Sequence, residues 1–173
     1  MHQGIGLGAF NLLPHRKAVH ALYECCNSVA MAGDLADARP YPGHNALFCK
    51  ADALLFALSD DSVDDILQAY PKVGSRPGSA RSHAEPCALW DDSPEVMRSL
   101  QRSARSYAEK FGFEFVMYVR DGSPVPAVIS AIAERMHNDG ETERKAVLNE
   151  IAKLNRSRLE RMLGPEGGYD NWA

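Results

Sequence analysis

The feature that most constrains the fold is apolar spacing, which is helical along most of the chain and strand-like in only one place. Apolar residues three or four positions apart indicate amphipathic helices, and they recur over residues 11–33, 45–58, 63–69, 94–110, 126–136 and 141–163. Phe113–Val119 is β-branched and aromatic enough for a strand, but no second convincing strand exists to pair with it. We therefore expect an extended or distorted connection there, and an all-α fold, an irregular helical bundle.

Capping and breaking residues set the expected helix ends. Asn11 is a candidate N-cap for one long amphipathic helix that ends near Gly33. Ser62 is expected to cap a short third helix that Pro71 stops. Ser93-Pro94 predicts another start, with serine at N-cap and proline at the first helical position.

Length and composition fit one domain. The chain has 173 residues, of which 45% are hydrophobic and 24% charged, enough for one well-buried core. Gly164-Pro165 and Gly167-Gly168 follow the last helix. We therefore expect a single helical domain over residues 1–164 and a flexible tail over 165–173.

Charge and motif spacing exclude several classes of function. A net charge of −4 and no dense basic stripe argue against nucleic-acid binding. No apolar run reaches the roughly 20 residues of a membrane helix, and no secretory signal is recognisable, so we expect a cytoplasmic protein. The four cysteines form no C-x-x-C pair and are read as reduced thiols, and the six histidines lack metal-ligand spacing. Gly4-Ile5-Gly6-Leu7-Gly8 lies at a terminus that we expect to be unanchored, so it predicts no phosphate loop.

Arg158 stands where the pattern of the last helix calls for a leucine. It follows Val147 by eleven residues, which places it about 20° from the line through Val147, Ile151 and Leu154 at roughly 100° per residue. Such a guanidinium either extends past its neighbours to water or holds an anion in an enclosed site with its planar set of donors.

The segment Lys72–Ala88 reads as a loop, because it mixes glycine, proline, serine and arginine without a sustained period. Within it, Ser82, His83 and Glu85 fall within four positions. Glu85 and His83 are candidate acid and base, and Ser82 a candidate hydrogen-bond donor, if the loop folds over a binding site. The alternative is a set of solvated loop residues.

Several motifs together resemble a known family. They are Phe10-Asn11, Cys25-Cys26-Asn27-Ser28, Arg39-Pro40-Tyr41, Tyr70-Pro71, Ser82-x-x-Glu85, Tyr107-x-x-Lys110-Phe111-Gly112-Phe113-x-Phe115-Val116, Arg135-x-x-Asn138-Asp139-x-x-x-Glu143 and Glu150-Ile151-x-x-Leu154-x-x-x-Arg158-Leu159. The sequence from Phe10 to Leu163 is similar to 2-oxo-4-hydroxy-4-carboxy-5-ureidoimidazoline (OHCU) decarboxylase. The block containing Phe111 and the arginine motif of the last helix are its most specific parts.

The resemblance implies an all-helical fold and a lyase of urate breakdown that needs no cofactor or metal and forms (S)-allantoin. The ring's own imine accepts the electrons released on decarboxylation, while the protein holds the substrate and delivers a proton to one face. The implied partner is a small anionic heterocycle, and a homodimer is plausible within the family. The positions that match the family's site are Pro71, Ser82, Glu85, Phe115, Val116 and Arg158.

Four family positions differ in this chain. Tyr70 replaces the family's catalytic histidine, Pro86 the glutamine after the glutamate, Met31 the tryptophan of the first helix, and Ala104 an asparagine. A tyrosine side chain in water has a pKa of about 10, so it is a poor base near neutral pH, although its hydroxyl still donates a hydrogen bond. Proline has no N–H to offer.

Three hypotheses follow. The favoured one is a divergent enzyme that performs lyase or isomerase chemistry on a small carboxylated or ureido-type heterocycle, for example in a biosynthetic pathway, with Arg158 and Glu85 binding it and Tyr70 at the catalytic position. The second is an ordinary OHCU decarboxylase in which His83 substitutes for the missing histidine. The third is a catalytically silent homologue that binds a ligand or partner.

Overall fold

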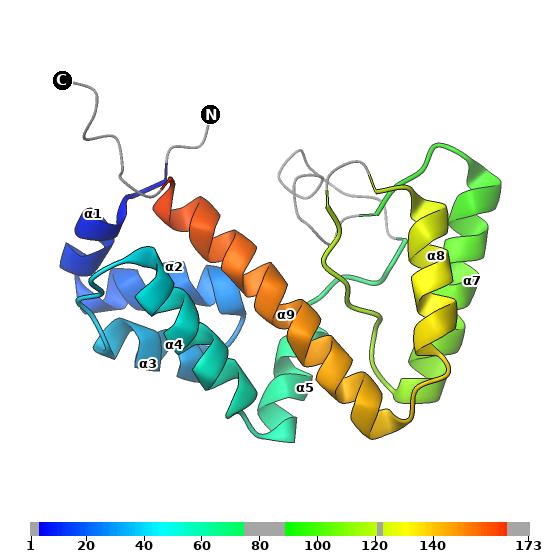
Figure 1. The fold of residues 1–173 in the computed structure, drawn as a ribbon, viewed down its shortest axis with the longest axis horizontal. Coiled ribbons are helices and arrows are strands. Elements are labelled where there is room, and N and C mark those ends of the chain that lie inside the picture. The colour runs from blue at the N-terminus through cyan, green and yellow to red at the C-terminus, as the bar shows by residue number, and fades with distance from the viewer. Residues whose placement is uncertain (1–3, 75–88, 121–122, 166–173) are drawn as a thin grey trace. The chain divides into compact units, whose positions relative to one another are not determined.

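In a computed structural model, the chain folds into a series of helices (Figure 1). The structure describes residues 4–74, 89–120 and 123–165. These residues hold helices and no strand, which confirms the expected all-α class. The helices are α1 Leu7–Leu12, α2 His15–Cys26, α3 Val29–Asp37, α4 His44–Phe56, α5 Asp60–Gln68, α7 Pro94–Phe111, α8 Val125–Arg135 and α9 Gly140–Leu163.

Contacts divide the described chain into two compact units. The first takes the residues up to Ile66 together with those from Asn155 onward, and the second is Leu67–Leu154. The N-terminal part of α9 therefore belongs to the second unit and its last turns to the first.

The core of the first unit is formed by apolar side chains from α1 to α5 and the end of α9. Its fully buried members include Phe10, Leu22, Met31, Leu35, Leu47 and Leu55. The Arg39 side chain binds the C-terminal end of α1. Its Nη1 donates to the carbonyl oxygens of Phe10 (2.9 Å) and Leu13 (2.8 Å). These charge-assisted bonds satisfy carbonyls that the ends of short helices leave open.

The long first helix expected over residues 11–33 is wrong, because the structure divides it into three. Pro14 lies between α1 and α2, and Asn27 adopts a left-handed conformation with φ 54° that ends α2. Ser28 then caps α3 by accepting a hydrogen bond from the Met31 backbone N–H at 3.3 Å. Gly33 lies inside α3 and ends nothing. The helical spacing of apolar residues continues from α2 into α3, so it did not reveal the break between them. That break depends on the local conformation of Asn27 and on the Ser28 cap.

The ends of the later helices follow the expected signals except at α5. Ser93 accepts from the Val96 N–H and Pro94 is the first residue of α7, as predicted. For α5 the prediction is wrong, since the helix begins at Asp60 and Ser59 Oγ accepts from the backbone N–H of Ser62 at 3.3 Å. Ser59, three residues earlier in the chain, takes the capping role assigned to Ser62.

The second unit has a core of its own between α7 and α8. Its buried side chains are Leu89, Met97, Leu100, Tyr107, Phe115, Val119, Val125, Val128 and Ile132. The segment 114–120 has neither helix nor strand, as the absence of a partner strand predicted. Gly112 starts this connection with φ 82°, a conformation that glycine adopts without steric cost.

The N-terminal glycine segment is anchored, contrary to expectation. Ile5 N–H donates to Met162 C=O and Gly6 N–H to Leu163 C=O, both at 2.8 Å. A Cβ on Gly4 would lie 2.1 Å from the backbone nitrogen of Gly164, so only glycine fits this approach. These bonds satisfy carbonyls at the end of α9. Beyond Pro165, the expected flexible tail lies outside the described residues.

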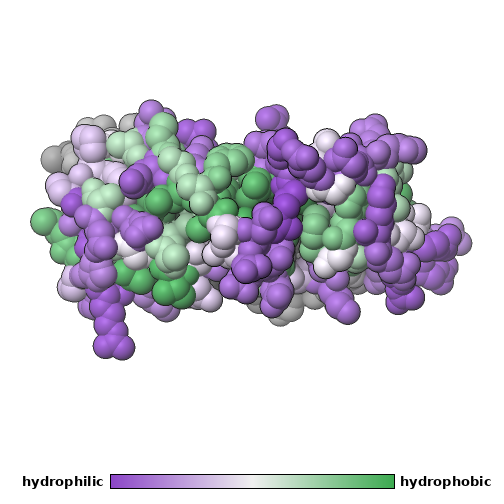
Figure 2. Space-filling model, turned by 90° about the horizontal axis from the view of Figure 1, so that it is seen from below, coloured by the Kyte–Doolittle hydropathy of each residue, from purple (hydrophilic) through white to green (hydrophobic). Residues whose placement is uncertain are grey.

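On the face drawn in Figure 2, hydrophobic patches lie between hydrophilic residues. Among residues 4–74, 89–120 and 123–165, the most exposed large apolar side chains are Leu12 at 86%, Val29 at 72% and Phe56 at 51%. Among the described helices, none is long and apolar enough to cross a membrane.

Candidate active site

Arg158 lies in the last turns of α9, within the first unit. The stripe that precedes it is buried, since Val147, Ile151 and Leu154 have no exposed surface. Arg158 itself is half-buried, and its Nη1 donates to the Cys25 carbonyl oxygen at 3.4 Å. The guanidinium is therefore held near the C-terminal end of α2. Its partial burial fits the enclosed alternative better than the fully solvated one.

The same part of α9 carries a polar residue that the sequence analysis missed. Asn155 is only 2% exposed, and neither its side-chain nitrogen nor its side-chain oxygen has a hydrogen-bond partner among the described residues. It precedes Arg158 by three residues, a spacing that makes two side chains neighbours on a helix. The available signal was the same as for Arg158, a polar residue between the apolar positions Ile151 and Leu159.

Two cysteines from α2 lie close to Arg158 in the first unit. Cys25 Sγ lies 3.9 Å from Met162 Sδ, and Cys26 Sγ contacts the Ser28 carbonyl oxygen at 3.6 Å. Burial raises the pKa of the Cys26 thiol, and this effect outweighs the bond to Ser28 and the positive charge of Arg158, which both lower it. The raised pKa favours the neutral thiol over the reactive thiolate.

Tyr70 and Pro71, in the second unit, directly follow α5. The Tyr70 side chain is buried at 7% exposure, and its backbone N–H donates to the Leu67 carbonyl oxygen at 3.2 Å. Pro71 is exposed. Tyr70 is thus a structured, enclosed residue, and the proline after it prevents the helix from continuing.

Phe115 and Val116 are both buried, at 4% and 2% exposure. The Phe115 ring meets the Tyr107 ring edge to face at 5.1 Å, and the Arg135 guanidinium lies 4.4 Å from the centre of the Phe115 ring. Arg135 Nη1 also donates to the Val116 carbonyl oxygen at 2.8 Å. One arginine therefore fixes both the side chain and the backbone of this extended segment.

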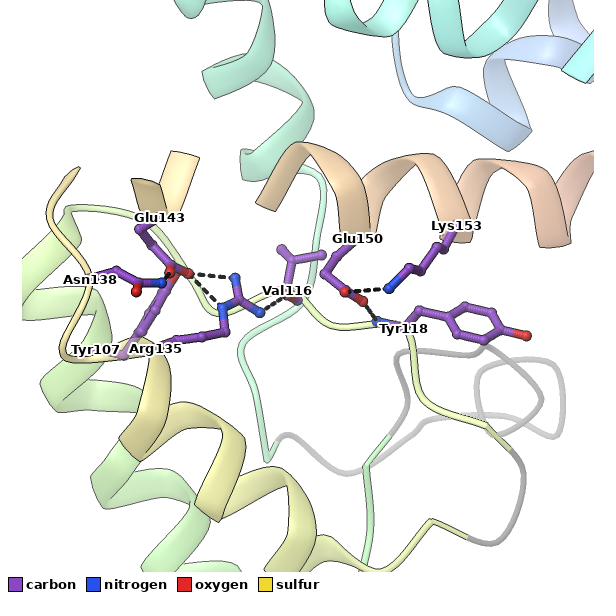
Figure 3. A network of polar contacts seen from close by, with 8 residues as sticks. All are labelled: Tyr107, Val116, Tyr118, Arg135, Asn138, Glu143, Glu150 and Lys153. Carbon is purple, nitrogen blue, oxygen red and sulfur yellow. Dashed lines mark hydrogen bonds and ion pairs between the residues drawn. The ribbon is translucent and has the colours of Figure 1, made fainter. Parts of the chain in front are cut away.

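A buried carboxylate holds Arg135 in place (Figure 3). Glu143 has no exposed surface. Its Oε1 accepts from Arg135 Nε at 2.8 Å and from the Tyr107 hydroxyl, and its Oε2 accepts from Asn138 Nδ2 at 2.9 Å. Burial, together with the bond to Glu143, raises the pKa of Tyr107 well above its ordinary value. Arg135 Nη2 makes no hydrogen bond within the described residues, but it forms an ion pair with Glu143 Oε1, so the buried carboxylate is paired with a positive charge.

A second carboxylate from α9 holds the same extended segment. Glu150 Oε2 accepts from the Tyr118 backbone N–H at 2.7 Å, while its Oε1 pairs with Lys153 Nζ at 2.8 Å (Figure 3). Backbone groups outside a helix or sheet need such partners. Arg135 and Glu150 together determine the path of the backbone on either side of Met117.

Part of the predicted site lies outside the described residues. This part comprises Ser82, His83, Glu85 and Pro86. Of the two other departures from the family pattern, Met31 is buried in α3 and Ala104 in α7. Within residues 4–74, 89–120 and 123–165, no group of three His, Cys, Asp or Glu side chains is arranged to hold a metal ion.

Comparison with known proteins identifies the family. A family model described as OHCU decarboxylase matches residues 11–160. This match covers most of the chain. The chain belongs to the OHCU decarboxylase family. The resemblance on the motifs from Phe10 to Leu163 is thereby confirmed.

Curated relatives of the OHCU decarboxylase family are similar over most of the chain. The OHCU decarboxylase of Haloferax volcanii is 32% identical over 151 residues, which cover 84% of this chain and 86% of that protein. The OHCU decarboxylase of Mus musculus is 28% identical over 153 residues, 83% of each chain. A uric acid degradation bifunctional protein of Bacillus sp. (strain TB-90) is 29% identical over 125 residues, and the matched part spans 25% of its length.

Two solved structures have a similar fold. An OHCU decarboxylase crystallised in the presence of (S)-allantoin has a TM-score of 0.70 and 20% identity, over 82% of this chain and 95% of the other. An (S)-allantoin synthase has a TM-score of 0.70 and 16% identity, over 91% of this chain and 54% of the other.

Proposed function

We propose that this chain is a divergent enzyme of the OHCU decarboxylase family, which performs cofactor-free lyase or isomerase chemistry on a small carboxylated or ureido-type heterocycle. The observation that carries the proposal is the placement of Arg158, half-buried and bonded to Cys25. It is the residue that matches the family's arginine, and a partly enclosed guanidinium is suited to bind an anionic substrate group.

The proposed roles differ from residue to residue. Arg158 binds an anionic group of the substrate, while Ser82 and Glu85 bind its polar groups. Pro71, Phe115 and Val116 line the substrate site, as at the matching family positions. Support for the last two comes from Arg135, which fixes the Val116 carbonyl and the Phe115 ring. A rigid backbone orients a substrate better than a mobile one.

For a decarboxylation, the chemistry balances without a cofactor. The bond between the ring carbon and the carboxylate breaks, carbon dioxide leaves, and the bonding electron pair moves into the adjacent ring imine. The ring carbon then takes a proton. The protein orients the carboxylate out of the ring plane and stabilises the charge that develops on the ring nitrogen.

Tyr70 is proposed as the proton donor in this step. A phenol is protonated at neutral pH, so it suits the proton-delivering half of the reaction rather than proton abstraction. The side chain is enclosed, which limits competition from bulk water. Water returns the proton to the phenolate and closes the cycle.

The test is an assay on freshly generated OHCU and on a panel of carboxylated heterocycles labelled with ¹³C in the carboxyl group. We expect carbon dioxide release or isomerisation with a substrate other than OHCU. Arg158→Ala and Glu85→Ala should abolish it without changing the circular dichroism spectrum. Tyr70→Phe should lower kcat by roughly 10²- to 10⁴-fold, the range of general acid catalysis.

Matched controls are Tyr23→Phe and Arg105→Ala, since both residues lie exposed on helices. Both variants should keep full activity. If wild-type protein accelerates (S)-allantoin formation from OHCU and His83→Ala abolishes this, the chain is an ordinary decarboxylase. If no compound in the panel turns over, the catalytic proposal is wrong and the silent homologue is the correct description.

A further inference from the structure

We propose that Asn155 is a second ligand-binding residue, which selects substrates that carry a ureido, amide or lactam group near their anionic group. The inference rests on the proposed function, because it assigns a role beside Arg158. It starts from one observation, namely that Asn155 is 2% exposed and has no side-chain hydrogen-bond partner among the described residues. Buried polar side chains are usually paired, and an unpaired one lowers stability. Such a cost is typical of functional sites.

The position of Asn155 places it beside the proposed anion-binding group. On α9, residues three apart are neighbours with Cβ atoms about 5–6 Å from each other, so Asn155 and Arg158 occupy adjacent positions in the first unit. Asn155 is polar, although its apolar neighbours on this face of α9, Ile151 and Leu159, are only 0% and 1% exposed. A leucine at position 155 would fit the surrounding pattern.

Two other polar residues on this part of α9, Arg156 and Arg158, have partners, whereas Asn155 has none among the described residues. Arg156 lies 5.0 Å from the centre of the Phe48 ring and 4.0 Å from Glu160. Arg158 is bonded to the Cys25 carbonyl oxygen. Only the amide of Asn155 is both buried and without a partner in this turn of the described chain.

The chemistry of a carboxamide specifies its ligand. Its N–H and C=O lie side by side, one donor beside one acceptor. The complementary edge on a small molecule is an adjacent C=O and N–H, as in an amide, a urea or a lactam. The Asn155 carboxamide would bind this edge, and the Arg158 guanidinium would bind a carboxylate. Together they predict a small anion whose C=O and N–H edge lies a few ångströms from its carboxylate.

The experiment compares two ligands that share a carboxylate. Hydantoin-5-acetate carries a cyclic ureide, and cyclopentylacetate has a similar ring without N–H or C=O. Calorimetric titration of wild-type protein should show tighter binding of hydantoin-5-acetate by roughly tenfold to a hundredfold, the effect expected when the other ligand leaves a buried donor and acceptor unpaired. Asn155→Leu should remove this preference and leave the affinity for cyclopentylacetate unchanged.

Further variants separate ligand binding from structure. Asn155→Asp should lower the affinity for both ligands, because the new carboxylate competes with the ligand's carboxylate for Arg158. The exposed residue Asn149 of the same helix gives the matched control, since Asn149→Leu should keep the wild-type preference. Asn155→Leu should unfold at the same or a higher temperature than wild type, because the substitution removes an unpaired polar group.

Three results would overturn the inference. They are equal affinities of wild-type protein for the two ligands, a preference that survives in Asn155→Leu, and no binding of either ligand. Because titration needs no turnover, the proposed function can fail separately. A protein that shows the preference depending on Asn155 yet transforms no substrate contradicts the enzyme proposal alone.

Discussion

At the scale of single residues, the two buried polar side chains contributed by α9 have opposite surroundings. Glu143 receives hydrogen bonds from three side chains, those of Arg135, Tyr107 and Asn138, whereas Asn155 receives none from the described residues. A satisfied network rigidifies the structure, and an unsatisfied group lowers its stability. This contrast is why we assign Glu143 to structure and Asn155 to ligand binding.

Replacing Arg135 should be severely destabilising. The Arg135→Ala substitution leaves the Glu143 carboxylate buried and uncompensated, which we expect to cost about 3–5 kcal/mol of unfolding free energy. Urea unfolding followed by circular dichroism measures it, with the exposed Arg98→Ala as control. Arg135→Met combined with Glu143→Leu should recover much of the loss, because neither charge then remains buried. A loss below 1 kcal/mol for Arg135→Ala would contradict the structural role of the network.

At the scale of elements, short local signals override the longer apolar period. The break between α2 and α3 depends on Asn27 in its left-handed conformation and on Ser28 as the cap. The extended segment that carries Phe115 and Val116 depends on two side chains distant in sequence, Arg135 and Glu150. Local residues thus set the helix boundaries, and tertiary contacts set the path of this connection.

Removal of the α3 cap should destabilise the first unit modestly. Ser28→Ala deletes the acceptor for the Met31 N–H and should lower the unfolding free energy by about 1 kcal/mol. Chemical denaturation measures the difference, and Ser106→Ala, at an exposed position of α7, should change it by less than about 0.5 kcal/mol. Equal effects of the two substitutions would argue against the cap.

Loss of Glu150 should loosen the extended segment. In Glu150→Ala the Tyr118 N–H loses its acceptor, so hydrogen exchange at this amide should become faster by at least about tenfold. Lys153→Ala is the control, because the 58% exposed Lys153 side chain pairs with Glu150 Oε1 and leaves Oε2, the acceptor for the Tyr118 N–H, in place. An unchanged exchange rate in Glu150→Ala would show that other contacts hold the backbone there.

At the scale of the whole molecule, each compact unit contains a tyrosine whose pKa is raised by burial. Tyr41 of the first unit has its pKa raised to about 12, mainly by burial, with the charge of Arg39 acting in the opposite direction. Tyr107 of the second unit is raised further by burial and by Glu143. Both phenols are therefore neutral in the folded protein at pH values where an unfolded tyrosine has begun to ionise.

Alkaline pH should destabilise both units. The folded state retains protons that the unfolded state releases above pH 10, so this contribution is fully present below about pH 10 and is lost as the pH rises toward 12 and beyond. The urea concentration at the midpoint of unfolding, measured from pH 8 to 11.5, should stay constant up to about pH 10 and then fall. Tyr41→Phe should be less stable than wild type at pH 8, because the Leu35 carbonyl loses its hydrogen bond, and should fall less steeply above pH 10. A parallel fall in both proteins would contradict the raised pKa of Tyr41.

Much of the architecture follows from the sequence. Apolar periodicity predicted the all-α class and most helices, because burying one face of a helix is a local property of its sequence. The lack of a partner for Phe113–Val119 correctly predicted a connection without sheet structure, and the motifs around Phe111 and Arg158 predicted the family. Periodicity failed at Asn27 and at Ser59, where one backbone conformation or one hydroxyl ends or begins a helix without disturbing the apolar pattern.

Tertiary structure decided the environment of each polar side chain. Sequence placed Arg158 on an apolar stripe but left open whether it extends to water, and only the fold put its guanidinium beside Cys25. The same holds for Asn155, whose burial depends on what packs against α9, and for Arg135, whose partners lie 8 to 20 residues away. Helical patterning is encoded by near neighbours, whereas burial and hydrogen bonding of a polar group depend on residues that only the folded chain brings together.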